Sequence, residues 1–329
     1  MMRIKNYFFM AAAIASAMSV FSCAKVEDST TVVKVEPITF GASFYKDEAD
    51  RTVGNKTVIV PDVDADGNPV YKILWEKSDQ IAVSGGTDPF VITPEIEEPS
   101  TSVNFYGEAA VADMYYAAYP YSALISWSGS TATMALPQIQ SARLGSFASD
   151  LNISVSSTTA EEQNFQFHNV LGYLKFTIGE QSGQITDFAV SAIGKEKLSG
   201  RFAVDCSNAE PALVADAGAN ITVAVSSEQP LAQGDYYLAM FPGTYAQGLR
   251  FIVNGPDGIA SKIIKPEGGL KLERGRVNTL GTIKVESWKE LGESGFDVEF
   301  LEDYFAEDNF GGEGEDMEGF GPEDSFEFN

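Results

Sequence analysis

The sequence predicts an all-β protein with two tandem antiparallel β-sandwich domains and an acidic C-terminal tail. From about residue 32 onward, apolar and polar residues alternate over 5 to 8 positions, which is the period of a β-strand. Clusters of Gly, Pro, Asn and Asp separate these runs at even spacing, and we find no helical stripe longer than two turns. Behind an N-terminal signal remain roughly 300 residues, the size of two ordinary domains.

The first 22 residues read as a lipoprotein signal peptide (1–22). A short basic region with Arg3 and Lys5 precedes an apolar stretch of about 15 residues, and the small residue Ser22 stands directly before Cys23. We therefore expect the mature chain to begin at Cys23, acylated with palmitate and anchored in the outer membrane. A general signal peptide that happens to contain a cysteine is the alternative. The stretch is shorter than the about 20 apolar residues of a membrane-spanning helix.

Individual strands follow from the alternation. A first strand is expected at 32–35, and a hairpin with strands 57–60 and 70–75 flanks the turn 62–69. A second hairpin, 249–253 with 261–264, flanks the turn 254–258. In the run 174–178, residues Leu174, Phe176 and Ile178 would share one face. The other expected strands are 115–119, 132–136, 221–225 and 236–240.

A break in composition near residues 157–162 predicts the domain boundary. We expect an N-terminal sandwich over 32–160, a C-terminal sandwich over 161–286 and a tail over 287–329. The tail differs sharply from the body, because residues 290–329 hold 15 Asp or Glu and no Lys or Arg. A block of like charge is typical of a solvated segment.

Charge and cysteine content exclude several classes of protein. The net charge of −25 argues against nucleic acid as a partner, since phosphates require clustered Lys and Arg. Cys206 is the only cysteine besides Cys23, so acylation of Cys23 leaves no pair for an intramolecular disulfide. We expect stability to come from packing.

Catalytic constellations are not found in the sequence. The only histidine, His168, excludes multi-histidine metal sites, leaves little room for a Ser-His-Asp triad and is expected to be structural. No local spacing identifies the two carboxylates of a glycoside hydrolase. We expect no enzyme activity and no cofactor.

One loop imitates part of a calcium site. Asp62, Asp64 and Asp66 are followed by Gly67, which matches the first half of a calcium-binding loop. The position of the bidentate glutamate is Ile73 instead. The other interpretation is an Asp-rich hairpin turn.

Several stretches, in this order, resemble the fimbrillin-like subunits of the type V pili of Bacteroidales. The resemblance begins at Leu74–Val83, where Trp75 and Asp79 match a Trp-x-x-Gly-Asp-x-Ile pattern with Ser78 in place of glycine. Together the stretches span residues 74–280, which is most of the mature body. The others are Tyr119-Pro120-Tyr121, Leu136–Gln140, Phe165–Phe176, Tyr236–Gly243 and Leu272–Leu280.

This resemblance implies transthyretin-like sandwiches, export as a lipoprotein, N-terminal trimming after an arginine and polymerisation by strand exchange with other pilin subunits. Arg51, in a polar segment, is the only arginine between the signal and residue 143. A trypsin-like surface protease acting there would remove a propeptide, 23–51, and leave Thr52 at the N-terminus of the mature form in the fimbrium. An ordinary solvated loop residue is the other interpretation of Arg51.

The tail offers a candidate donor strand at 296–300. Strict alternation places Phe296, Val298 and Phe300 on one face, where they could fill apolar pockets of another subunit. The Gly-rich acidic remainder is interpreted as disordered, as a contact for a basic partner or as the mark of an accessory subunit.

The leading hypothesis is thus a structural subunit of a cell-surface fimbria. The alternative is a surface lipoprotein that binds glycan or protein ligands through sandwich loops. In that case Trp75, Trp127 and four tyrosines could stack on sugars, the tyrosines being Tyr115, Tyr116, Tyr119 and Tyr121.

Overall fold

The structure is a computed structural model that describes residues 33–44, 58–63, 69–180, 183–285, 288 and 325–328. The chain divides into Met1–Val33 and a compact unit, Lys34–Asn329. The all-β prediction is confirmed: the described residues form strands and two single-turn 3-10 helices, Tyr121–Ala123 and Ser149–Leu151. Among them, no helix is long and apolar enough to cross a membrane.

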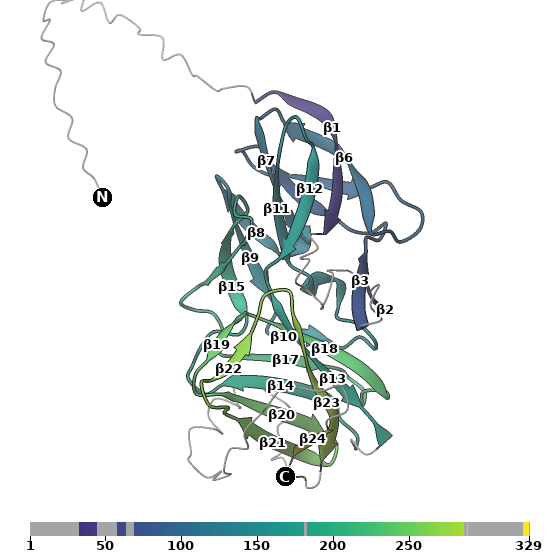
Figure 1. The fold of residues 1–329 in the computed structure, drawn as a ribbon, viewed down its shortest axis with the longest axis vertical. Helices are drawn as coiled ribbons and strands as arrows, with labels where there is room; N and C mark the ends of the chain where they lie inside the picture. The colour runs from purple at the N-terminus through teal and green to yellow at the C-terminus, as the bar shows by residue number, and fades with distance from the viewer. Residues whose placement is uncertain are drawn as a thin grey trace, which may run out of the picture. The chain divides into compact units, whose positions relative to one another are not determined.

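A closed barrel forms the first part of the compact unit (Figure 1), where the sequence predicted a sandwich. Its order is β1-β12-β11-β7-β4-β5-β6. The inward residues of these strands alternate with outward ones, so that a barrel can close around one aromatic core. The strands are β1 (Val35–Phe44), β4 (Ile81–Ser84), β5 (Phe90–Pro94), β6 (Ser102–Ala110), β7 (Met114–Tyr119), β11 (Ser154–Thr159) and β12 (Asn164–Asn169).

Two sheets farther along the chain enclose a second core. One has the order β10-β17-β14-β20-β21 and the other β18-β13-β23-β24. Leu174, Phe176 and Ile178 on β13 all point into this core, as the alternation predicted. The strands are β10 (Ile139–Ser141), β13 (Gly172–Ile178), β14 (Asp187–Ala192), β17 (Thr222–Ser226), β18 (Gly234–Met240), β20 (Leu249–Gly255), β21 (Gly258–Ile264), β23 (Val277–Val285) and β24 (Ser325–Phe328).

Three smaller sheets complete the described fold. Four strands in the order β16-β15-β9-β8 contribute to a third core, which also includes Tyr173 of β13 and Tyr237 of β18. Two two-stranded sheets pair β19 with β22 and β2 with β3. These strands are β2 (Val58–Val63), β3 (Pro69–Leu74), β8 (Leu124–Ser128), β9 (Thr131–Leu136), β15 (Gly200–Asp205), β16 (Leu213–Ala215), β19 (Gly243–Tyr245) and β22 (Leu270–Leu272).

Both predicted hairpins are confirmed with tighter turns. β2 pairs antiparallel with β3 up to Val63 and Pro69, and β20 pairs with β21 up to Gly255 and Gly258. The first strand was placed wrongly at 32–35. It runs instead from Val35 to Phe44, because its inward aromatic residues lie in the second half of that segment.

Strand pairing crosses the predicted domain boundary at residues 160 and 161 in both directions. β12 follows that boundary but pairs with β1 and β11 of the barrel. β10 precedes it but pairs in parallel with β17 of the second part. Local composition carries no information on such long-range pairing, and the boundary stays a prediction.

The segment Trp75–Asp79 has a structural role in the barrel. Trp75 is 1% exposed and lies in the core. Asp79 is buried, where its carboxylate accepts hydrogen bonds from the Tyr119 hydroxyl (3.0 Å) and the Glu76 backbone N–H (2.7 Å). The motif therefore places Trp75 in the core and, directly after it, a turn over residues 76–79 that the Asp79 carboxylate holds in place.

Candidate functional site

The strand β1 closes the barrel between two partners (Figure 1). It pairs antiparallel with β6, from Val35 opposite Ala110 to Ser43 opposite Ser102. On its other side it pairs in parallel with β12, from Gly41 opposite Asn164 to Phe44 opposite Phe167. The slot between β6 and β12 is therefore filled by the first described strand of the chain.

Alternate side chains of β1 point into the barrel core. Phe40 is fully buried, with its ring centroid 5.0 Å from that of Tyr115 and 4.8 Å from that of Phe165. Ala42 is 2% exposed. Phe44 stacks on Trp75 with 4.4 Å between centroids. The slot thus accepts an aromatic, a small and an aromatic side chain at successive inward positions.

Gly41 permits a close approach between β1 and β12. A Cβ atom at this position would lie 2.8 Å from Oδ1 of Asn164. The Gly41 N–H donates to the Gln163 carbonyl over 2.9 Å. A side chain at Gly41 would therefore push against β12 where the two strands meet.

Most of the residues that the sequence singled out lie outside the described residues. These are Cys23, Arg51, Thr52, Asp64, Asp66, Phe296, Val298 and Phe300. Asp62 is part of strand β2. The predicted lipid site, cleavage site, calcium loop and donor strand therefore stay predictions. In the part of the chain that the structure describes, no group of three or more His, Cys, Asp or Glu is placed to hold a metal ion.

The end of the tail forms a strand, which the sequence did not predict; disorder was one of three interpretations of the residues after Phe300. Ser325–Phe328 is β24, which pairs in parallel with β23 from Thr282 opposite Ser325 to Val285 opposite Phe328. An open sheet edge offers unpaired backbone groups, which a short segment from elsewhere in the chain can satisfy. The sequence could not show that this edge of β23 was open.

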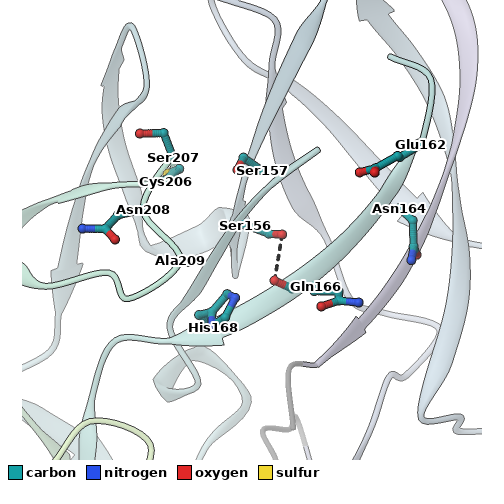
Figure 2. A pocket seen from close by; sticks show the side chains of 10 residues that line it. All are labelled: Ser156, Ser157, Glu162, Asn164, Gln166, His168, Cys206, Ser207, Asn208 and Ala209. Atoms are coloured by element: carbon teal, nitrogen blue, oxygen red, sulfur yellow. Dashed lines mark hydrogen bonds between the residues drawn. The ribbon is translucent and has the colours of Figure 1, made fainter. Parts of the chain in front are cut away.

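A polar pocket lies on the outer side of the barrel, against the loop that follows β15. Figure 2 shows the ten side chains that line it, with Glu162, Asn164, Gln166 and His168 on one side and the loop residues 206–209 on the other. Its volume is about 570 Å³. Sequence reasoning missed this site, although the alternation of residues 164–168, polar outward and phenylalanine inward, was a usable signal.

The pocket lining includes His168 on β12 and Cys206 on the facing loop, but the Cys206 thiol is not activated as a nucleophile. Burial raises the pKa of the Cys206 thiol to about 12, so the thiolate is scarce at neutral pH. Burial, with a smaller contribution from the Arg274 charge, lowers the pKa of His168, and the Glu210 carboxylate opposes that shift. At neutral pH the imidazole and the thiol are therefore both uncharged.

Half of the six aromatic side chains proposed for sugar stacking lie inside the protein. Trp75, Tyr115 and Tyr119 are at most 4% exposed. Trp127 is half-buried, and its indole N–H donates to the Gly129 carbonyl over 2.8 Å. Core packing accounts for the buried three, so they cannot form a stacking surface.

Comparison with known proteins gives distant similarity only. No protein-family model and no curated protein matches the sequence. Among solved structures, a candidate cell adhesion protein from Bacteroides ovatus is similar, with 12% identity over 69% of this chain and 89% of that one and a TM-score of 0.44. A second, from Bacteroides uniformis, has 12% identity, coverages of 64% and 88% and a TM-score of 0.41. The tip fimbrial protein Mfa3 from Porphyromonas gingivalis has 10% identity, coverages of 70% and 82% and a TM-score of 0.34.

Proposed function

We propose that this protein is a structural subunit of a cell-surface fimbria, exported as a lipoprotein and assembled by protease-triggered strand exchange. The observation that carries the proposal is the position of β1, which closes the barrel and immediately precedes the polar segment containing Arg51. Cleavage after Arg51 would separate the whole of β1 from the rest of the barrel. The lipid on Cys23 would then be a temporary tether that delivers the subunit to its assembly site.

Departure of β1 would create an acceptor groove. The backbones of β6 and β12 would each lose a paired neighbour, and the space of Phe40 beside Tyr115 and Phe165 would open. A groove with unpaired backbone groups and apolar pockets binds an added strand.

The predicted donor segment in the tail has a matching pattern. Phe296, Val298 and Phe300 repeat the aromatic, small, aromatic spacing of Phe40, Ala42 and Phe44. The acidic residues between them would stay in water. The tail of one subunit is thus suited to replace β1 of the next.

Processing can be tested on the surface-exposed protein by mass spectrometry. We expect an N-terminus at Thr52 in assembled fimbriae and at lipidated Cys23 in the precursor. Arg51→Ala should retain Cys23 and assemble poorly, whereas Lys46→Ala, a basic residue on the same segment, should behave as wild type. Wild-type assembly by Arg51→Ala would reject the processing step.

The donor assignment has a separate test. Deleting residues 294–329 should abolish polymerisation, but this deletion also removes β24. Val298→Asp keeps the length and β24 while placing a charge where an apolar side chain must be buried, and it should also block polymerisation. Glu299→Ala, on the opposite face, is the matched control. Normal fibres from Val298→Asp would reject this donor strand.

The raised pKa of the Cys206 thiol gives no support to a cysteine nucleophile in the pocket. The alternative of a lipoprotein that binds glycans through aromatic loops has less support, since three of its six aromatic side chains are core residues. Retention of Cys23 on a monomeric surface protein would favour that alternative over the fimbrial proposal.

A further inference from the structure

The outer face of β12 carries a row of polar side chains that packing does not require. Asn164, Gln166 and His168 point outward, while Phe165 and Phe167 fill the barrel core. Residues two apart on a strand are about 7 Å from each other. The row therefore presents polar groups at regular intervals along one wall of the pocket (Figure 2).

Several of these groups have hydrogen-bonding capacity to offer. The side-chain amides of Asn164 and Gln166 are exposed and make no hydrogen bond to the residues that the structure describes. Across the pocket, Oδ1 of Asn208 accepts from the Glu210 backbone N–H over 3.0 Å, which orients its amide and leaves the NH₂ group available. The pocket thus offers hydrogen-bond donors and acceptors from two facing walls.

The charge of the lining selects against ionic ligands. The ten lining residues include no Lys or Arg, and Glu162 is their only carboxylate. The lowered pKa of His168 keeps its imidazole uncharged at neutral pH. A phosphate or sulfate would find no cation among the lining residues, and a divalent cation would find too few anionic oxygens.

Peptides are also poorly suited to this pocket. β12 pairs with β1 along residues 164–167 and with β11 at residues 168 and 169. On the β11 side, the Gln166 carbonyl accepts from the Ser156 hydroxyl and the Asn164 N–H donates to the Thr158 hydroxyl, so these backbone groups are already bonded and an extended peptide would have to displace them. The lining has no large apolar side chain to receive a peptide anchor. A ligand rich in neutral hydroxyl groups matches the amides and serine hydroxyls best.

We propose that the pocket between β12 and the 206–209 loop binds a neutral saccharide through Asn164, Gln166 and Asn208. The volume of about 570 Å³ lies within the range of small-molecule sites and leaves room for more than one sugar ring. This assignment goes beyond strand exchange and holds whether or not β1 is ever released.

The test uses the purified full-length protein with lactose, maltose, cellobiose and chitobiose as probes, in saturation-transfer NMR and calorimetry. We expect saturable binding of at least one of them, in the millimolar to micromolar range of Kd. The double variant Gln166→Ala with Asn208→Ala should weaken it about tenfold or more, because two hydrogen bonds are lost. Gln229→Ala, an exposed amide far along the sequence, is the control and should leave Kd unchanged.

Three outcomes would overturn the proposal. The first is no saturable binding of any of the four disaccharides up to about 10 mM. The second is binding that the double variant leaves unaltered while its thermal unfolding matches wild type. The third is tighter binding of a sulfated disaccharide than of every neutral one, because that would require a cation that the pocket lacks.

Discussion

Phe40→Ala tests whether β1 is held in the barrel as the structure describes. The Phe40 side chain is fully buried and contacts the rings of Tyr115 and Phe165. Burial of a whole phenylalanine stabilises by about 1.5–3 kcal/mol, and each aromatic pair adds about 0.5–1.5 kcal/mol. The free energy of unfolding should therefore fall by about 3–5 kcal/mol, the usual cost of truncating a buried phenylalanine.

Urea unfolding followed by tryptophan fluorescence provides the assay, because the indole of Trp75 lies in the same core. Thr39→Ala is the matched control, since Thr39 is the exposed neighbour on the same strand and its truncation should cost less than about 1 kcal/mol. If Phe40→Ala and Thr39→Ala lower the free energy of unfolding equally, Phe40 does not lie in the barrel core as the structure describes. Circular dichroism of both variants establishes that the remaining strands are folded.

Three further predictions concern single residues. Gly41→Val should lower the free energy of unfolding by about 1–3 kcal/mol, because the Cβ of the new valine would meet the Asn164 side chain. Adding Asn164→Ala should restore part of the lost stability. If the double variant is no more stable than Gly41→Val alone, this contact is contradicted. Cys206 should resist thiol reagents at pH 8 in the folded protein and react after denaturation, and rapid native reaction would show that its pKa is not raised. The folded-state pKa of His168 lies below its ordinary value of 6.5, so around that pH the folded protein binds fewer protons than the unfolded chain. The free energy of unfolding should therefore fall as the pH drops through 6.5. His168→Gln should remove that part of the pH dependence in urea titrations, and identical pH profiles would argue against it.

Local alternation predicted the strands well where one face is buried. The run 174–178 became β13 with its apolar face in the core, and both predicted hairpins formed. In each case the residues that pair or pack lie close in the sequence, so the two-residue period and the turn residues carry the information.

Closure of the barrel could not be predicted in the same way. Phe40 and Phe165 lie in one core although more than a hundred residues separate them. Their contact depends on the parallel pairing of β1 with β12, which leaves no local pattern. For the same reason, the sequence predicted neither β24 nor the pocket between β12 and the 206–209 loop.

By itself, the sequence determined the all-β class, nine strands of the body and the inward face of the run 174–178, because hydrophobic alternation is a local property of the chain. It also supplied the hypotheses at Cys23, Arg51 and the 296–300 segment, which lie outside the described residues. Only the tertiary structure decided that the first part closes into a barrel, which strand completes it and which polar residues face one another across a pocket. Those features depend on backbone hydrogen bonds between distant segments, and such bonds are nearly independent of side-chain identity.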